Sequence, residues 1–316
     1  MKTWTSIVVM LFAIHAYAQY EVTNTNDSGA GSLREAITNA NGNAGTDNIT
    51  FNIPNTDLNY SLDGGTGNET WTIYPVTDLP EITEGVVLDA TTQPGSGNYR
   101  IKIDGQGTRS RGFWVNSGFA EVYGFYLTGF NANSSSAGVY ILHIGGAPSI
   151  IGAVGKGNVI NSCRNGISIS LRAGCIIKGN LIGTDETGEI DLGNTVGIQL
   201  ATSASSQIVG GDLAGEGNLI SGNTTGITAN ASGGHSVRGN YIGTNIDGTT
   251  AIPNGAGISF ATSNNNSFVN NLISGNSGSA IRLGFSTNNT IQGNIIGEGS
   301  DGSVLGNDRG IEAFNT

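Results

Sequence analysis

The densest group of side chains that could do chemistry is a run of carboxylates. It contains Asp185, Glu186, Glu189 and Asp191, and the basic residues Arg172 and Lys178 lie shortly before it. Polysaccharide hydrolases need an acid and a second group, a base or a nucleophile, across the glycosidic bond. Calcium-dependent lyases need several carboxylates around the ion and an Arg or Lys as base. The run therefore has the composition of either kind of site.

A turn explains the same carboxylates without catalysis. All four lie in one segment, and the two corresponding segments downstream contain only Asp247, Asp301 and a trailing Asp308. Asp is a common turn residue, and acidic side chains keep an exported protein soluble. We therefore assign no catalytic residue and no cofactor other than calcium. The candidate calcium ligands are Asp185, Glu186, Glu189 and Asp191.

Repeated phrases predict the element that positions these residues. Gly-Asn followed by an apolar pair alternates with Gly-Ile from Gly157 onward, in fixed order. The first phrase or a variant of it contains Asn158, Asn180, Asn218, Asn240, Asn271 and Asn294, which are 22, 38, 22, 31 and 23 residues apart. A unit of about two dozen residues, sometimes lengthened by an insert, is the coil of a parallel β-helix.

Each coil would hold short strands with alternating apolar positions, such as Ile167-Ser168-Ile169. Stacking coils about 4.8 Å apart pairs every strand with the next and builds a core of Ile, Val and Leu columns. The recurring Asn fits a corner, where it can bond the Asn of the next coil, and the preceding Gly would supply a positive φ. We predict an all-β fold, a right-handed parallel β-helix (solenoid) over residues 49–316, truncated at the C-terminus.

Three coils carry an insert of about a dozen residues. Gly188, Gly248 and Gly302 each lie eight positions after a corner Asn, and the last two follow an Asp. The insert therefore resembles a small hairpin that projects from one side of the solenoid. Loops repeated on one face are where solenoids usually bind, so we expect the insert face to be the binding face.

Histidine and cysteine predict no metal site. The histidines beyond the first 18 residues are His143 and His235, and two His with two Cys scattered along the chain do not make a zinc site. His235 occupies the corner position that Asn289 holds in a later coil, so we expect it to substitute in a corner ladder. Cys163 and Cys175 fall at different corners of one coil, further apart than a disulfide reaches, and we predict buried thiols.

Aromatic residues cluster before the regular repeats, and an exposed row of them would form a platform for stacking sugars. The alternation Tyr123, Phe125, Leu127 predicts that at least half of the cluster faces the core. The cluster consists of Phe113, Trp114, Phe119, Tyr123, Phe125, Tyr126 and Phe130.

The first 18 residues have the three parts of a secretory signal peptide. Lys2 is followed by an apolar run over 7–14 and by the cleavage site Ala16-Tyr17-Ala18. Neither this run nor any later segment is long and apolar enough to span a bilayer. We therefore expect a secreted, extracellular or cell-surface protein.

Residues 19–48 predict a strand and a short helix instead of a coil. Ser32 and Glu35 have the spacing of a capping box, and the residues that follow Ser32 form a short apolar stripe. We expect this N-terminal capping helix to cover the end of the core, where apolar side chains and strand edges would otherwise be exposed.

The charge of the chain limits its partners. The sequence has 13 basic and 24 acidic residues, and removing residues 1–18 leaves 12 basic and 24 acidic residues. This acidity disfavours nucleic acid and other polyanions, except where cations bridge them. We expect a monomer that has no transmembrane segment and binds no nucleic acid.

The sequence resembles the secreted bacterial right-handed parallel β-helix proteins of the pectin-lyase-like superfamily. The resemblance covers nearly the whole chain after residue 18 and implies a large surface or secreted protein, often adhesin-like, with a C-terminal sorting segment. The superfamily includes enzymes and non-enzymes, so the fold alone fixes no function. The residues that carry it are the Ser-Leu-Arg-Glu-Ala motif at 32–36, Leu79-Pro80-Glu81-Ile82, Leu88-Asp89, Thr92-Gln93-Pro94-Gly95 and the Gly-Asn-aliphatic-Ile-Gly-Thr phrases.

Three functions follow from the sequence. The first is an adhesin-like scaffold that presents its insert face to a polysaccharide, a cell-surface glycan or another surface partner. The second is a secreted polysaccharide lyase, epimerase or hydrolase, which would need a groove with several carboxylates and a base from neighbouring coils. The third is a structural spacer for a missing C-terminal module. Repetition without a unique charged cleft favours the first.

Overall fold

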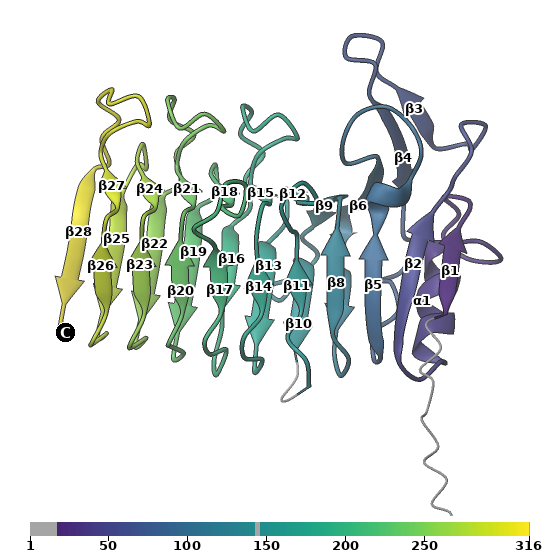
Figure 1. Cartoon of the computed structure of the whole chain (residues 1–316), viewed down its shortest axis with the longest axis horizontal. Helices are drawn as coiled ribbons and strands as arrows, with labels where there is room; N and C mark the ends of the chain where they lie inside the picture. The colour runs from purple at the N-terminus through teal and green to yellow at the C-terminus, as the bar shows by residue number, and fades with distance from the viewer. Residues whose placement is uncertain (1–17, 143–145, 316) are drawn as a thin grey trace, which may run out of the picture.

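The computed structural model describes residues 18–142 and 146–315, and it is the predicted parallel β-helix (Figure 1). The predicted signal peptide, apart from Ala18, and His143 lie outside the described residues. No helix in the described part of the chain is long and apolar enough to cross a membrane.

Three sheets run along the solenoid axis, and nearly all of their strand pairs are parallel. Sheet A contains β1 (Gln19–Val22), β2 (Thr46–Phe51), β5 (Gly85–Asp89), β8 (Ala120–Tyr123), β11 (Ile150–Ile151), β14 (Ile176–Ile177), β17 (Ile208–Gly210), β20 (Ser236–Arg238), β23 (Ser267–Val269) and β26 (Thr290–Gln292). Sheet B contains β3 (Tyr60–Leu62), β4 (Glu69–Ile73), β6 (Ile101–Arg109), β9 (Phe125–Phe130), β12 (Val159–Asn161), β15 (Leu181–Ile182), β18 (Leu219–Ile220), β21 (Tyr241–Ile242), β24 (Leu272–Ile273) and β27 (Ile295–Ile296). Sheet C contains β7 (Arg111–Val115), β10 (Ala137–Leu142), β13 (Asn165–Ser170), β16 (Val196–Leu200), β19 (Thr225–Asn230), β22 (Ala256–Ala261), β25 (Ser279–Gly284) and β28 (Arg309–Phe314).

Columns of apolar side chains fill the inside of the solenoid, as the repeats predict. The second residue of each apolar pair faces inward on sheet B, and its neighbours in the next coils occupy the same position. These inward residues are fully buried and include Ile160, Ile182, Ile220, Ile242 and Ile273. The predicted buried thiols Cys163 and Cys175 are both buried and free.

Asn side chains close the corners between sheets A and B. In each step the Oδ1 of one Asn accepts from the backbone and the side-chain amide of the preceding Asn, as for Asn180 and Asn218 at 3.1 and 2.9 Å. This confirms the predicted ladder, which runs through Asn158, Asn180, Asn218, Asn240, Asn271 and Asn294. A second ladder, which was not predicted, closes the corner between sheets B and C through Asn194, Asn223, Asn254, Asn276 and Asn307.

His235 stands in a third ladder, as predicted. Its Nδ1 accepts from the backbone of Gln207 at 3.2 Å, and its own backbone N–H donates to Asn266, which in turn bonds Asn289. The imidazole is almost fully buried, and burial lowers the pKa of His235 to about 4. It is therefore a neutral structural side chain at neutral pH.

A short helix packs against the N-terminal coils. The helix α1 (Leu33–Asn41) begins after Ser32, whose hydroxyl accepts from the backbone of Glu35. Its buried side chains, Leu33 and Ile37 among them, join the solenoid core. A 3₁₀ helix, η1 (Ala90–Thr92), follows β5.

The aromatic cluster is less buried than predicted. Phe113, Phe125 and Phe130 are in the core, but Trp114, Phe119, Tyr123 and Tyr126 remain partly exposed. The alternation that should have turned Tyr123 inward is broken because the chain rounds a corner at Gly124, where φ is +74°. Tyr123 therefore faces outward and donates to Glu121 at 2.7 Å.

Candidate functional site

The outer face of sheet B carries a second apolar column. Because successive residues of a strand point to opposite faces, the first residue of each apolar pair faces outward. In register these residues are Tyr126, Val159, Leu181, Leu219 and Tyr241. Val159, Leu181 and Leu219 are nevertheless buried, in a small cluster of their own that also contacts Tyr99. Loops and inserts must therefore cover this face.

One wall of the covered face is built by two glycine-rich loops. The first wall loop (152–157) joins β11 to β12, and the second (211–217) joins β17 to β18. A Cβ on Gly157 would lie 1.7 Å from the carbonyl oxygen of Gly179, so only glycine fits there. The predicted positive φ before the corner Asn is thus wrong at Gly157 and Gly217, where close packing requires glycine, and is confirmed at Gly179, at +67°.

The inserts build the opposite wall. They comprise residues 183–193, 243–253 and 297–306, each closed by an antiparallel bridge, and they project from the same edge of the solenoid (Figure 1). The backbone of Ile246 donates to the carbonyl of Gly188 at 3.2 Å, and that of Ser300 to the carbonyl of Gly248 at 2.9 Å. The inserts therefore stack on one another across the intervening coils and form a continuous ridge.

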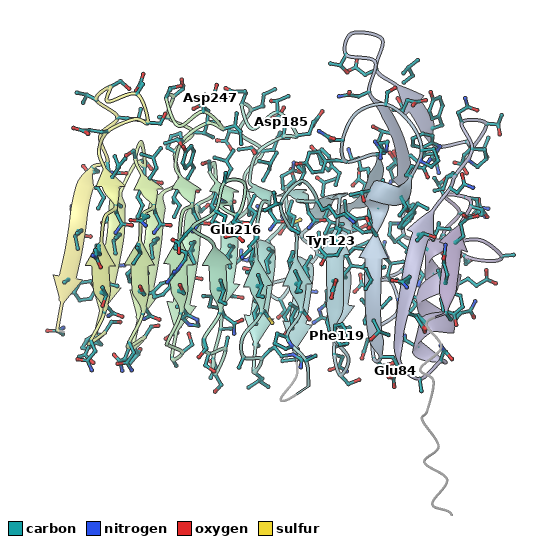
Figure 2. All side chains as sticks on the ribbon, in the orientation of Figure 1. Glu84, Phe119, Tyr123, Asp185, Glu216 and Asp247 are labelled. Atoms are coloured by element: carbon teal, nitrogen blue, oxygen red, sulfur yellow. The ribbon has the colours of Figure 1, made fainter. Side chains whose placement is uncertain are left out.

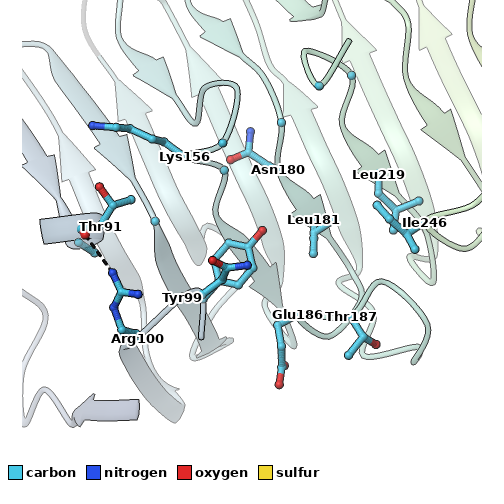
Figure 3. A pocket seen from close by; sticks show the side chains of 18 residues that line it. Thr91, Tyr99, Arg100, Lys156, Asn180, Leu181, Glu186, Thr187, Leu219 and Ile246 are labelled. Atoms are coloured by element: carbon cyan, nitrogen blue, oxygen red, sulfur yellow. Dashed lines mark hydrogen bonds between the residues drawn. The ribbon is translucent and has the colours of Figure 1, made fainter. Parts of the chain in front are cut away.

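A groove of three adjoining hollows follows the outer face of sheet B, and its central and C-terminal hollows lie between the two walls. The central hollow, about 580 Å³, is floored by Leu181 and Leu219 (Figure 3). It shares Asn98, Tyr99 and Glu186 with the N-terminal hollow, about 370 Å³. It shares Gly215, Gly217, Leu219 and Ile246 with the C-terminal hollow, about 430 Å³. All three are within the size range of small-ligand sites, roughly 300–1,000 Å³.

Most charged groups beside the central hollow are held by other parts of the chain. Lys156 pairs with Asp89 at 2.7 Å, and Lys178 pairs with Glu216 of the second wall loop at 2.7 Å. The Arg100 guanidinium donates to the backbone carbonyls of Thr91 at 3.0 Å and Gly97 at 2.6 Å (Figure 3). These groups fix the loops that shape the hollow.

Tyr99, Lys102 and Glu186 differ from these groups. Within the described residues, none of the three side chains forms a hydrogen bond or ion pair, although the Lys102 amine lies 5.1 Å from the ring centre of Tyr126. Burial, and secondarily the negative charge of Glu186, raise the pKa of Tyr99 above its ordinary value. The groove therefore presents a neutral phenol, an ammonium group and a carboxylate that the fold does not use.

The four predicted calcium ligands point in different directions. Asp185 is buried and accepts from the Thr187 hydroxyl and from the backbones of Glu189 and Ile190, all within its own turn. Glu189 bonds Asn245 of the second insert, Asp191 bonds the backbone of Gly193, and Glu186 faces the groove. Figure 2 labels Asp185 in the first insert. No group of three or more His, Cys, Asp or Glu among residues 18–142 and 146–315 is placed to hold a metal ion, and the calcium site stays a prediction.

The two basic residues named with that run are also separated from it. Arg172 is buried at the corner between sheets C and A, where it donates to the carbonyl of Gly118. Lys178 is paired with Glu216. The sequence missed Tyr99 and Lys102 because no repeated phrase surrounds them. The apolar pair that follows each Gly-Asn could have predicted the floor, because two adjacent residues of a strand cannot both face the core and one of them must face outward.

No family model and no curated protein matches the chain. Among solved structures, the Dettilon tailspike protein (gp208) superposes with a TM-score of 0.49 at 17% identity, over 96% of this chain and 58% of the tailspike chain. The A-modules of the Azotobacter vinelandii mannuronan C-5 epimerases AlgE6 and AlgE4 superpose with TM-scores of 0.40 and 0.36, at 11% and 10% identity, over 94% of this chain and 98% and 100% of theirs. The likeness concerns the fold alone.

Proposed function

We propose that the protein is an extracellular, adhesin-like β-helix scaffold that binds a polysaccharide along the groove on sheet B. The observation that carries the proposal is the groove itself, whose apolar floor spans several coils between two walls. A solenoid repeats its surface along one axis, so such a groove suits a ligand that also repeats along one axis.

The lining of the groove suits sugar rings. A pyranose ring has an apolar face that stacks on aromatic side chains, and Tyr99, Tyr126 and Tyr241 line the three hollows. Glycines of the wall loops leave backbone groups accessible for hydrogen bonds with hydroxyls, and Asn98 and Thr187 add side-chain partners. This mixture of apolar surface and few polar groups is typical of small-molecule sites.

A polysaccharide-cleaving or epimerising enzyme is the second candidate. The observation that favours it is the presence of Tyr99, Lys102 and Glu186 at one hollow, because carboxylates, phenols and amines serve as general acids and bases. Hydrolysis needs two acidic groups, however, and Glu186 supplies the one carboxylate among the described residues that line the N-terminal and central hollows. Binding without cleavage is therefore the better supported function.

The test is binding of the purified chain to polygalacturonate, alginate, xylan, chitin and hyaluronan, measured by calorimetry and glycan array. We expect at least one polymer to bind, and Tyr99→Ala to weaken that binding roughly 10-fold. Tyr140→Ala is the matched control, because Tyr140 is a half-buried tyrosine on the outer face of sheet C. Absence of binding by folded protein would overturn the proposal.

The same samples distinguish the second candidate. New reducing ends or unsaturated products, released by the wild-type chain and lost in Glu186→Gln, would make the protein an enzyme. Each assay is run with and without calcium, because the predicted ligands Asp185, Glu189 and Asp191 lie in the insert wall. Binding without any release supports the scaffold.

A further inference from the structure

The groove has two different ends. At the N-terminal side sheet B finishes with β4 and β3, and β3 is the last strand in the order of the sheet. These two strands form an antiparallel hairpin, in which Leu62 faces Glu69, and the hairpin projects on the same side of the solenoid as the inserts (Figure 1). Within the described part of the chain, no further coil therefore extends the floor of the groove in this direction.

The hairpin is anchored as a wall. Trp71 is buried and donates from Nε1 to the carbonyl of Pro54 at 3.0 Å, while its ring packs against Tyr60 at 5.1 Å. Glu69 accepts from the Tyr60 hydroxyl at 2.9 Å and from the backbone of Ser96 at 2.6 Å. Ser96 belongs to the segment between η1 and β6 that also carries Tyr99, so hairpin and segment are joined.

The C-terminal side has no such wall. After the second wall loop, the corners between sheets A and B are tight turns at Asn240, Asn271 and Asn294. The glycine-rich wall of the groove therefore ends with the second wall loop.

The N-terminal hollow, at the closed end, has a distinct lining. Most of its hydroxyl and amide groups come from the hairpin and the η1–β6 segment, one hydroxyl comes from Tyr126 of β9, and its charged groups are Lys102 and Glu186. These residues are Ser61, Asn68, Thr70, Thr72, Tyr74, Asn98, Tyr99, Lys102, Tyr126 and Glu186. A polymer that follows the floor past Tyr99 meets hydrogen-bonding groups on several sides there, followed by the hairpin.

We infer that the groove is blind at its N-terminal end and takes the end of a polysaccharide chain, with the terminal sugar in the N-terminal hollow. The inference rests on the proposed function and adds to it that internal segments of a long chain are not ligands. A terminal sugar has one more free hydroxyl than an internal residue. Lys102 and Glu186, whose side chains form no hydrogen bond or ion pair among the described residues, are the groups we expect to bind it.

The test is the stoichiometry of binding as a function of chain length. Polygalacturonate, alginate, xylan, chitin and hyaluronan are each used as short, intermediate and long size fractions, and calorimetry gives the number of protein molecules bound per polysaccharide chain. The inference predicts a fixed number at every length for whichever polymer binds. A number that rises in proportion to length overturns the inference and leaves the proposed function standing.

Two sets of variants complete the experiment. Thr70→Trp fills the N-terminal hollow and should weaken binding at least roughly 10-fold, whereas Thr228→Trp on sheet C is the matched control. Lys102→Met and Glu186→Gln should each weaken binding roughly 10-fold, since each removes one charge-assisted hydrogen bond. Unchanged affinity in Thr70→Trp, in protein with the wild-type melting temperature, would contradict occupancy of this hollow. Failure of every polymer to bind the wild-type chain overturns both proposals.

Discussion

The N-terminal region, residues 19–157, and the C-terminal region, residues 158–315, solve the same packing problem in different ways. In the C-terminal region the corners between sheets A and B and between sheets B and C repeat an Asn that bonds its counterpart one coil away, as Asn180 bonds Asn218. In the N-terminal region each corner has its own solution. Gln93, for example, is buried and bonds both the backbone N–H and the carbonyl of Ile53 at 2.9 Å.

Side-chain composition differs in the same sense. The core of the C-terminal region is mainly columns of Ile, and only five aromatic residues follow Asn158, namely Tyr241, Phe260, Phe268, Phe285 and Phe314. The N-terminal core contains packed aromatic rings, such as Phe125, whose ring centre lies 5.4 Å from that of Phe51 and 5.0 Å from that of Phe113. A repeat gives stability by stacking equal layers, but equal layers offer equal surfaces. The unique groups of the groove, Tyr99 and Lys102, come from the irregular region.

The largest expected effect is on the repeated region, at the Asn ladder. Asn218→Ala removes the acceptor of two Asn180 donors and the donor to the Ile177 carbonyl, all of them buried. Unsatisfied buried groups cost about 1–3 kcal/mol each, so we expect the free energy of unfolding to fall by at least about 3 kcal/mol. Chemical denaturation followed by circular dichroism measures the change.

The last rung of the ladder is the control for this prediction. Asn294→Ala removes the same kind of side chain and the same two contacts from the preceding Asn, but Asn294 is only half-buried and its amide donates to no further Asn among the described residues. A loss as large as that of Asn218→Ala would show that the ladder does not depend on burial between stacked coils, and the contrast between the two regions would lose its energetic basis.

The next largest effect is a pH dependence of the free energy of unfolding, caused by the imidazole of His235 in the third ladder. Burial lowers the pKa of His235 to about 4, whereas an unfolded histidine titrates near 6.5. Between these values the unfolded chain binds a proton that the folded chain does not. The contribution of the neutral His235 imidazole to the free energy of unfolding is therefore intact above about pH 6.5. It is lost as the pH falls to about 4, which lowers the free energy of unfolding by up to about 3 kcal/mol.

His235→Asn isolates this titration. Asn266 and Asn289 occupy the equivalent ladder position in the next two coils, so an Asn side chain fits this corner. Asn also has no titratable group. The difference in unfolding free energy between variant and wild type should change across this pH window and stay constant above it. A parallel pH dependence of both proteins would place the acid sensitivity elsewhere, among the carboxylates.

The difference between the repeated and the irregular region also determines which structural elements could be predicted from the sequence. The phrases around Asn158 to Asn294 predicted coils, corners and inserts because each element has the same local cause in every coil. His235 could be placed in a ladder because it precedes its Gly-Asn phrase by the same number of residues as Asn289 precedes the corresponding phrase in a later coil. The hairpin β3–β4 and the segment carrying Tyr99 have no repeat, so their positions follow from tertiary contacts such as that of Trp71 with Pro54.

The candidate site was predicted only in part. The insert face was expected to bind, and the inserts do form one wall of the groove, but only Glu186 of the four predicted carboxylates faces it. Asp185 could not be separated from Glu186 by sequence, since which of two adjacent acids closes a turn depends on the backbone geometry of the insert. The Gly-Asn phrase requires glycine for two different reasons, a positive φ at Gly179 and close packing at Gly157. The sequence of the phrase is the same in both cases and does not distinguish them.

A smaller effect compares the two regions within the groove. Tyr99 comes from the irregular region and lines two hollows, whereas Tyr241 is the aromatic member of a repeated position and lines the C-terminal hollow alone. We expect Tyr99→Ala to weaken polysaccharide binding roughly 10-fold and Tyr241→Ala only a few-fold. Calorimetric affinities on the same polymer measure both. An equal or larger loss in Tyr241→Ala would move the centre of binding into the repeated region.

The smallest effect concerns the ion pairs that hold the wall loops. Lys156 in the first wall loop pairs with Asp89, and the Lys156 side chain is 46% exposed. Exposed pairs contribute little, so Lys156→Met should change the free energy of unfolding by less than about 1 kcal/mol, and added salt should reduce the difference. Thermal melting at low and high salt measures both quantities. The loop should keep its position in the variant, because the backbone of Gly157 is packed against the carbonyl of Gly179 with no room for a side chain. A loss comparable to that of Asn218→Ala would mean that side-chain charges, and not the repeated backbone, hold this wall of the groove, and the two regions would then share one mechanism of stabilisation.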